Sequence, residues 1–187
     1  MGVIIFLWEM KLMPLNEGYL KAKTTKESDE TYTPAYAIKP ILKYIPKDKI
    51  VWCPFDTQES EYVKLIKKNG NTVIFSHINE GKDFFSYEPE KYDCIVSNPP
   101  FSLKDKVLKR LYELDMPYAI LLPIPSLQGQ KRFPYIKDCE ALIFDKRINY
   151  YKDYKTKEVQ KGVSFGSFYL CRKMLPERLI FEELIID

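Results

Sequence analysis

Apolar positions along the chain repeat with two different periods, and the alternation between these periods predicts an α/β fold. Short apolar runs, typical of buried strands, occupy residues 49–53, 72–75, 92–97 and 118–122. Between these runs, apolar residues recur at the i, i+3, i+4 spacing of helices. Strands that alternate with helices indicate a Rossmann-like fold, in which helices flank a mostly parallel twisted sheet with right-handed crossovers.

The first predicted helix lies ahead of the first strand. Thr33 and Pro34 are typical of a helix cap and of a first helical position, respectively. An apolar face follows them at helical spacing, and we expect Pro40 to kink this helix and Pro46 to end it. The helix should therefore cover the sheet immediately before the first strand begins.

Two further helices have recognisable ends. One should follow residue 56, with acidic residues near its start, lysines near its end, and Asn69 and Gly70 to stop it. Ser102 can cap the other, which carries an apolar stripe over residues 103–114. Each of these helices would connect two neighbouring parallel strands.

The last third of the chain has a different pattern. Residues 141–144 and 163–171 resemble strands, and they enclose a basic stretch rich in tyrosine. We expect them to form an antiparallel pair that makes up one edge of the sheet. Residues 1–30 read as an extension or a mobile arm, so the prediction is a single domain of 187 residues with its catalytic core at 31–175.

Composition narrows the class of protein. The chain is 45% hydrophobic and 29% charged, which is typical of one soluble globular domain. Its net charge is only +3, so any contact with nucleic acid must come from a local patch. A single histidine excludes a site built from several histidines, and we expect no metal.

The cysteines and the amino-terminal apolar run indicate in which cellular compartment the protein resides. The spacing of the four cysteines fits neither paired zinc ligands nor a compact disulfide framework, so we expect reduced, mostly buried thiols. Residues 2–8 form an apolar run that is too short to span a bilayer and lacks the flanks of a secretion signal. The sequence therefore predicts a cytoplasmic protein with no membrane contact.

One segment points to specific chemistry. The apolar run at residues 92–97 leads directly into Asn98, Pro99, Pro100 and Phe101. In open α/β sheets, ligands bind at the carboxyl ends of strands. Two prolines supply no backbone donors, so the amide oxygen of Asn98 and a nearby carbonyl can converge as acceptors for both hydrogens of an amino group. The ring of Phe101 can stack on a flat substrate. The alternative is that this segment is only a turn between strand and helix, stiffened by its prolines.

With this motif, the chain resembles the N6-adenine DNA methyltransferases. Their amine-binding motif is Asn/Asp-Pro-Pro-aromatic, at the end of the fourth strand of the sheet. The cofactor half precedes this motif, which is the gamma arrangement. Residues 51–56, Val-Trp-Cys-Pro-Phe-Asp, together with residues 98–102 most resemble the EcoRI-type adenine methylases and their phage-borne relatives. The resemblance covers residues 31–175 and implies a class I methyltransferase fold and a phage or mobile-element origin.

The resemblance also implies S-adenosylmethionine as cofactor and a set of residues that bind it. These residues are Thr33, Pro34, Pro54, Phe55, Asp56, Asn79, Asp83 and Phe84. The chain has no glycine between Gly18 and Gly70, so the loop after the first strand must form the pocket differently from a glycine-rich loop. The residues alone leave alternatives open. Asp56 could simply be a residue at the start of a helix, and Glu80 could take the place of Asn79. Asp83 and Phe84 could belong to ordinary packing between a loop and the core.

On the substrate side, the resemblance implies DNA with an adenine flipped out of the stack. Asn98, Pro99 and Phe101 would clamp that base. Gln128, Lys131 and Arg132 follow the fourth apolar run and are the best candidates for phosphate and base contacts. The basic, tyrosine-rich residues 146–161 suit a strand-binding loop or a solvated hairpin loop. A chain of this size has little room for a separate domain that recognises a DNA sequence. We therefore expect its sequence specificity to be modest, or to be supplied by a homo-oligomer or a partner.

Two other functions fit the same residues. The amine could belong to a base in RNA, to N4 of cytosine or to a protein glutamine, since the Asn-Pro-Pro-Phe motif occurs in those families too. The order of the motifs and the match at residues 51–56 favour adenine in DNA. Alternatively, the chain is a catalytically inactive DNA-binding module, although an intact Asn98 argues for an enzyme.

Overall fold

A single mixed sheet forms the body of the protein. The structure is a computed structural model that describes residues 31–160, 163 and 165–186, so the predictions for residues 1–30 lie outside it. Within these residues the strand order is β2-β1-β3-β4-β6-β5-β7. The strands are β1 (Ile50–Cys53), β2 (Thr72–Phe75), β3 (Cys94–Ser97), β4 (Tyr118–Pro123), β5 (Glu140–Phe144), β6 (Ser167–Arg172) and β7 (Leu179–Glu182).

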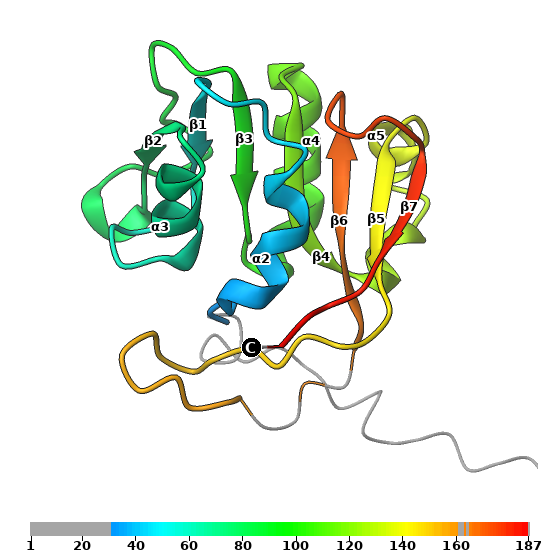
Figure 1. Cartoon of the computed structure of the whole chain (residues 1–187). Coiled ribbons are helices and arrows are strands. Elements are labelled where there is room, and N and C mark those ends of the chain that lie inside the picture. Colours follow the sequence, from blue (N-terminus) through cyan, green and yellow to red (C-terminus); the bar gives the residue numbers. More distant parts are fainter. Residues whose placement is uncertain (1–30, 161–162, 164, 187) are drawn as a thin grey trace, which may run out of the picture.

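The sheet consists of a parallel half and a mixed half. Strands β2, β1, β3 and β4 are parallel to one another, which confirms the predicted α/β fold with a mostly parallel sheet. Strand β6 is antiparallel to both β4 and β5. The carboxyl ends of the four parallel strands therefore meet at one edge of the sheet, and the long segment between β5 and β6 runs along that edge (Figure 1).

Helices cover both faces of the sheet. Helices α2 (Ala35–Leu42) and α3 (Glu61–Lys68) lie on one face, and α4 (Lys104–Leu114) lies on the opposite face (Figure 1). This placement follows from right-handed crossovers, because α3 leads outward from β1 to β2 whereas α4 leads in the other direction from β3 to β4. The short elements are α5 (Phe133–Ile136), η2 (Ile78–Glu80), η3 (Phe101–Leu103) and η4 (Ile124–Leu127).

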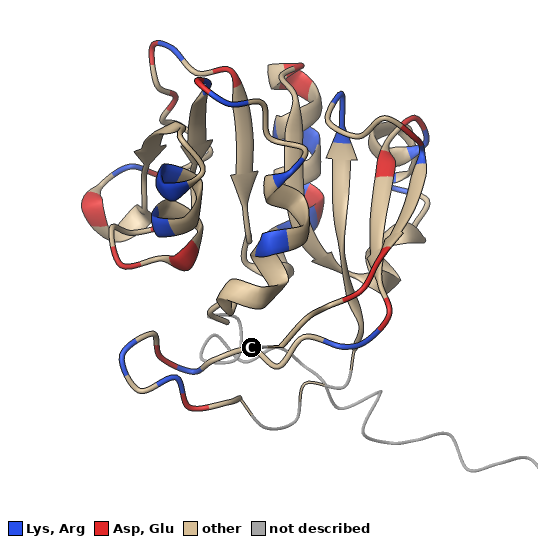
Figure 2. Ribbon diagram, viewed as in Figure 1, with Lys and Arg blue, Asp and Glu red and all other residues tan. Residues whose placement is uncertain are grey.

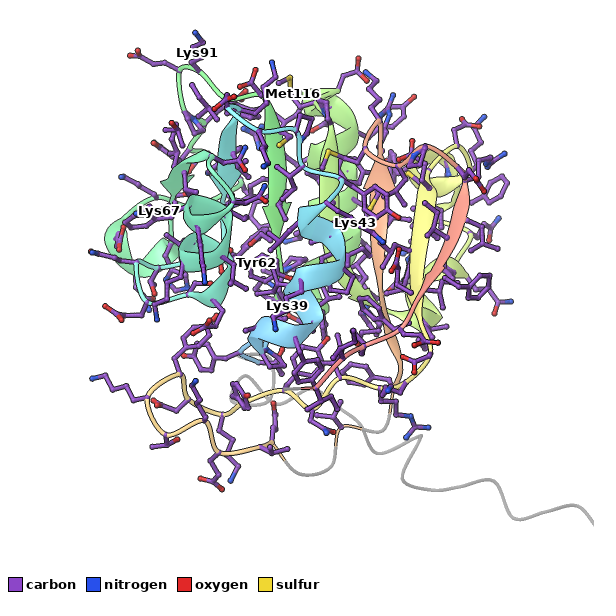
Figure 3. All side chains as sticks on the ribbon, in the orientation of Figure 1. Lys39, Lys43, Tyr62, Lys67, Lys91 and Met116 are labelled. Atoms are coloured by element: carbon purple, nitrogen blue, oxygen red, sulfur yellow. The ribbon has the colours of Figure 1, made fainter. Side chains whose placement is uncertain are left out.

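The core lies between the sheet and the helices and is rich in aromatic side chains. Trp52 on β1 is fully buried, and its indole nitrogen donates a hydrogen bond to the Ser76 hydroxyl at 2.9 Å. The buried hydroxyls of Tyr62 and Tyr169 are 2.7 Å apart, which joins α3 to β6, and Figure 3 labels Tyr62 in the helix layer in front of the sheet. All four cysteines are buried and free, as predicted.

Two helix starts differ from the sequence prediction. Helix α2 begins at Ala35 with Pro34 at the cap position, and the Thr33 hydroxyl makes no hydrogen bond to a described residue. Ser102 was expected to cap the third helix, but it lies inside η3, and the cap position of α4 belongs to Leu103. In both cases a proline restricts the backbone just before the helix. The helix therefore starts one or two residues away from the serine or threonine that was expected to cap it.

The end of α2 also differs from the prediction. The helix passes through Pro40 and ends at Leu42, four residues before the predicted stop at Pro46. Turn hydrogen bonds from the Tyr44 and Ile45 amides to the Ile41 and Leu42 carbonyls tighten the chain after the helix. Pro40 removes one backbone hydrogen-bond donor from the helix. Burial of the apolar face of α2 offsets this loss, so the helix continues through the proline.

The strand count around the motif differs as well. The resemblance places Asn-Pro-Pro-Phe after the fourth strand, yet here it follows β3, the third strand in chain order. Residues 76–93 form η2 and turns rather than a strand. Gly81, Pro89 and many polar residues interrupt the apolar runs there. The antiparallel pairing of β5 with β6 is confirmed, but its predicted position at the edge is wrong.

The true edge on this side is β7, which the sequence prediction missed. It pairs with β5 in parallel register, with Leu142 opposite Ile180. The sheet therefore extends beyond residue 175, where the predicted catalytic core ends. A run of only four residues with one exposed face, beginning three residues after Pro176, gives a weak strand pattern, which explains the omission.

Candidate active site

A cavity of about 690 Å³ lies at the edge where β1, β2 and β3 end. Its volume is within the range of small-molecule sites, which is about 300–1,000 Å³. The lining residues fall within segments 31–33, 54–64, 77–85, 98–106 and 153–155. The cavity is therefore built at the carboxyl ends of parallel strands, where open α/β sheets bind their ligands.

Asn98 presents an unpaired acceptor to this cavity. Strand β3 ends at Ser97 because Pro99 and Pro100 cannot donate to a neighbouring strand. The amide nitrogen of Asn98 donates to the Thr31 carbonyl at 3.1 Å, which fixes the orientation of the side chain. Its amide oxygen is buried and has no hydrogen-bond partner among the described residues. A buried acceptor without a partner is costly, so this atom is suited to a ligand that donates a hydrogen.

Of the other three residues of the motif, one lines the cavity and two do not. Pro100 lines the cavity, whereas Pro99 is buried behind it. The ring of Phe101 is only 8% exposed and packs edge-on against Tyr150 and Phe165, with centroids 6.2 and 5.5 Å away. Phe101 is thus part of an aromatic cluster that supports the cavity, and its stacking on a base stays a prediction.

Asp56 lies at the floor of the cavity in a network of hydroxyl groups. Its carboxylate accepts hydrogen bonds from Ser60 and from Ser97, the latter at 2.5 Å. Burial raises the pKa of this carboxyl to about 6, although the two hydroxyl donors act in the opposite direction. Because Ser97 ends β3 and Asp56 follows β1, the carboxylate ties together the ends of two strands that position the site.

Aromatic side chains from two distant segments close the cavity. Tyr154 donates a hydrogen bond to the Ser60 hydroxyl at 3.1 Å, and its ring packs on Tyr32 with centroids 4.4 Å apart. The backbones of Tyr32 and Tyr151 form an isolated antiparallel bridge. We call residues 31–33 and 153–155 the roof of the cavity. Burial raises the pKa of Tyr154, so its hydroxyl stays protonated and remains a donor at neutral pH.

The tyrosines of residues 146–160 turn toward the body of the protein. Tyr150 is fully buried, and its hydroxyl donates to Ser167 at 2.8 Å. Tyr154 is held by Ser60, as described above. This arrangement differs from a loop that presents its tyrosines to nucleic acid, whereas its lysines Lys152, Lys155 and Lys157 are exposed.

Seven of the eight predicted cofactor residues line the cavity. Pro54, Phe55, Asp56, Asn79, Asp83, Phe84 and Thr33 all line it, and Pro34 lies just outside. Phe55 and Phe84 form an apolar wall, with ring centroids 4.9 Å apart, and Phe84 packs further on Trp52. Asp83 also caps a turn, because its carboxylate accepts from the Phe85 amide at 3.0 Å.

The predicted substrate residues lie away from the cavity. Arg132 is held internally, since its guanidinium binds Asp105 at 2.7 Å and the Gln128 carbonyl at 2.7 Å. This ion pair also lowers the pKa of Asp105. The side chains of Gln128 and Lys131 are exposed. The structure therefore leaves Gln128 and Lys131 accessible to a large ligand, and a role of these three residues in DNA binding stays a prediction.

Comparison with known proteins identifies a relative over part of the chain. The chain is similar to a methyltransferase. It is 31% identical over 86 residues to the type II methyltransferase M.EcoRI of Escherichia coli, an alignment that covers 41% of this chain and 26% of that protein. The chain therefore spans about a quarter of the length of this curated relative. No family model matches the chain.

Two solved structures resemble the fold at low sequence identity. A type I restriction-modification system methyltransferase subunit from Streptococcus thermophilus is 12% identical, with a TM-score of 0.44, over 82% of this chain and 47% of that one. A dimethyladenosine transferase from Plasmodium falciparum is 11% identical, with a TM-score of 0.47, over 77% of this chain and 64% of that one.

The similarity to M.EcoRI confirms the predicted resemblance at the level of methyltransferase homology. The gamma arrangement, adenine specificity and phage origin stay predictions. Among the described residues, no three histidine, cysteine or acidic side chains gather as a metal site. None of the helices in this part of the chain is long and apolar enough to cross a membrane.

Sequence reasoning missed the residues that hold Asp56 and the roof. Ser60 is the helix cap of α3, since its hydroxyl accepts from the Tyr62 amide at 3.2 Å. A serine just before a helical pattern could have indicated that cap. Ser97 and Tyr154 gave no such signal, because their contacts join residues that are far apart in the sequence.

We expect Ser60→Ala to lower the free energy of unfolding by about 2–4 kcal/mol. Loss of a helix cap costs about 1 kcal/mol, and one buried carboxylate oxygen of Asp56 loses its donor, which costs about 1–3 kcal/mol. Urea denaturation would measure the change. Ser86→Ala is the control, because Ser86 is exposed and outside the network. Equal stability of the two variants would contradict the importance of this network.

Asp56 should make stability depend on pH. Its pKa is about 6 in the folded protein but about 3.9 in an unfolded chain. The folded state therefore holds the proton more tightly, so the contribution to stability is complete below pH 4 and is lost as the pH rises through 6. Relative to Asp56→Asn, we expect the free energy of unfolding to fall by roughly 2–3 kcal/mol between pH 4 and 7. Parallel pH curves for the two proteins would refute this assignment.

Proposed function

We propose that this protein transfers a methyl group from S-adenosylmethionine to the exocyclic N6 amine of adenine in DNA. One observation carries the proposal: the amide oxygen of Asn98 is buried at the edge of a cavity and has no partner among the described residues. The similarity to M.EcoRI supports the methyltransferase class, and the Asn-Pro-Pro-Phe motif supports an amine as acceptor.

The residues of the cavity fit the implied cofactor. The cavity is large enough for a nucleoside, and the rings of Phe55 and Phe84 give it an apolar wall. The buried hydroxyl of Thr33 has no partner among the described residues and is free to bind a polar group. When bound, S-adenosylmethionine supplies a methyl group activated by its positively charged sulfur. Asp56 holds the ends of β1 and β3 in place around it.

Asn98 would act on the amine of the acceptor. The lone pair of an aromatic amine is delocalised into the ring, so the nitrogen is a poor nucleophile. An acceptor on its hydrogens favours the pyramidal form, in which the lone pair is available. The amide oxygen of Asn98 is positioned before the substrate arrives, because its nitrogen is already bound to Thr31. We place the carbonyl of Pro99 as the second acceptor. Catalysis then rests mainly on positioning.

The proposal includes DNA because three lysines line the cavity, although Glu59 and Asp153 line it as well and the Glu59 carboxylate lies 3.8 Å from the Lys64 amine. Lys64, Lys106 and Lys155 line it, and they would lie near the phosphates of a nucleotide whose base enters the site. Reaching adenine in a duplex requires flipping the base out of the stack, at a cost of a few kcal/mol. A single-stranded substrate avoids this cost, so we expect methylation of single-stranded DNA to be at least as fast as that of duplex DNA.

The test is transfer of a labelled methyl group to unmethylated DNA, followed by digestion to nucleosides. Labelled N6-methyladenine would support the proposal in full. Label on cytosine, or transfer only to RNA or protein glutamine, would retain the methyltransferase and overturn the adenine assignment. If calorimetry detects no binding of S-adenosylmethionine and no label is transferred, the chain is a binding module, and the proposal fails.

A further inference from the structure

The outer edge of β7 has no partner within the described part of the chain. This strand ends the sheet and pairs only with β5 (Figure 1). Edge strands are commonly protected by lysine, proline or a bulge, because their free backbone groups otherwise attract another strand. The first three residues of β7 are Leu179, Ile180 and Phe181, and Figure 2 shows charge on this strand only toward its carboxyl end.

Backbone hydrogen bonds establish which groups of β7 remain free. The Ala141 amide donates to the Arg178 carbonyl at 2.8 Å, and the Asp145 amide donates to the Glu182 carbonyl at 3.1 Å. Since backbone groups alternate in direction along a strand, Ile180 also faces β5. Leu179 and Phe181 therefore direct their amides and carbonyls outward, where another strand can bind them.

The side chains on one face of this edge are apolar and exposed. Leu179 is 49% exposed and Phe181 is 70% exposed, and they lie beside Ala141 and Ile143 of β5 in the register of the sheet. On the other face, Glu182 accepts a hydrogen bond from the Tyr44 hydroxyl at 3.0 Å. The edge thus combines free backbone groups with an apolar surface that water contacts.

We propose that β7 pairs antiparallel with β7 of a second copy of this chain, with Ile180 opposite the same residue of the copy. In this register, outward-facing Leu179 and Phe181 lie opposite each other and form the hydrogen-bonded pairs. On the other face, Arg178 lies opposite Glu182, although each side chain is already bound within its own chain, Arg178 to the Lys137 carbonyl and Glu182 to Lys43 and Tyr44. Two-fold symmetry repeats each pair, so the strand is complementary to itself in its apolar contacts.

Neighbouring registers lack this complementarity. Placing Phe181 opposite itself brings Leu179 against Glu183 and Ile180 against Glu182. Placing Leu179 opposite itself brings Arg178 against Ile180. Registers shifted by one residue are excluded, because they bring outward-facing backbone groups against groups that are already bonded to β5. The one unfavourable pair in the proposed register is Glu177 with Glu183, outside the strand.

The geometry also limits the strength and consequences of pairing. A four-residue strand buries little surface compared with stable interfaces of about 1,200–2,000 Å², so the dimer should be weak and depend on concentration. A two-fold axis perpendicular to the sheet places the two cavities at opposite edges of the joined sheet. Pairing is therefore independent of catalysis and of the proposed function.

Disulfide cross-linking tests the register directly. In the proposed pairing, the two copies of Ile180 form a non-hydrogen-bonded pair with Cα atoms about 4.5 Å apart, within disulfide range. Under mild oxidation, Ile180→Cys should form a covalent dimer about tenfold faster than Phe181→Cys, whose copies lie diagonally at about 7–8 Å. The native cysteines are buried and do not compete. Equal or faster linking of Phe181→Cys would overturn the register.

Sedimentation of the full chain over a range of concentrations tests the dimer itself. We expect the mass to rise from 22.1 kDa toward twice that value. Phe181→Lys should abolish this rise, whereas Ile185→Lys, which alters a residue of similar exposure outside β7, should not. Glu177→Lys should strengthen the dimer, because it replaces the like-charge pair with attraction to Glu183. A chain that stays monomeric at every concentration, or an Ile185→Lys effect equal to that of Phe181→Lys, would overturn the proposal.

Discussion

We expect Asn98→Ala to lower kcat for methyl transfer by about 100- to 1,000-fold, the usual effect of removing one preorganised hydrogen-bonding group from an active site. The variant loses the buried amide oxygen that Asn98 offers to the amine of the substrate. Its binding of S-adenosylmethionine should change little, because the apolar wall of Phe55 and Phe84 is untouched. Single-turnover kinetics would measure the chemical step, and calorimetry would measure cofactor binding.

Two other variants make this result interpretable. Asn149→Ala removes an exposed asparagine outside the cavity and should keep full activity. Asn98→Asp keeps an acceptor oxygen but loses the donor to the Thr31 carbonyl, so its activity should lie between those of the wild type and Asn98→Ala. If Asn98→Ala transfers methyl groups at the normal rate, the amide does not hold the amine and the proposed mechanism is wrong.

The second large effect concerns Phe84. Its ring is 1% exposed and packs on Trp52, Phe55 and Phe85, with centroids 4.9–5.6 Å away. We expect Phe84→Ala to lower the free energy of unfolding by about 3–5 kcal/mol, because a large buried ring leaves a cavity that its neighbours fill only in part. Urea denaturation would measure the loss. Cofactor affinity should fall as well, since this ring forms part of the cavity wall.

Comparison with two gentler substitutions separates stability from binding. Phe84→Leu keeps most of the volume and should cost less than about 1.5 kcal/mol of stability. Phe55 is only partly buried, so Phe55→Ala should destabilise the fold less than Phe84→Ala while weakening cofactor binding to a similar extent. Unchanged cofactor affinity in Phe55→Ala would show that the rings of Phe55 and Phe84 stabilise the core but do not bind the cofactor.

The elements that carry strong local patterns could be predicted from the sequence. Strand β2 has the predicted bounds, and β1, β3 and β4 differ from prediction by one or two residues at an end. Buried parallel strands are continuous apolar runs, which polar neighbours make easy to recognise. The Asn98 motif was recognisable because two consecutive prolines between a strand and a helix are a strong local constraint.

Features that depend on long-range contacts could not be predicted in this way. The contact of Ser97 with Asp56 and that of Tyr154 with Ser60 span 41 and 94 residues. Nothing in the neighbourhood of Tyr154 distinguishes it from Tyr150 or Tyr151, which have other roles. Similarly, Arg132 resembled a phosphate-binding residue because its partner, Asp105, lies 27 residues earlier in the chain. Pattern alone does not show which charges a fold neutralises internally.

The construction of the roof has a consequence for how a ligand reaches the cavity. Tyr32, Tyr151 and Val159 are joined by isolated bridges rather than by a continuous ladder, and Tyr154 is tethered by one hydrogen bond. Few bonds must break to open this segment, so its opening free energy is far below that of global unfolding. In hydrogen exchange, the Tyr151 amide should therefore exchange by local fluctuation while the amides of β3 and β4 exchange only with the whole sheet. Local opening of this segment then widens access to the cavity, with the sheet intact beneath it.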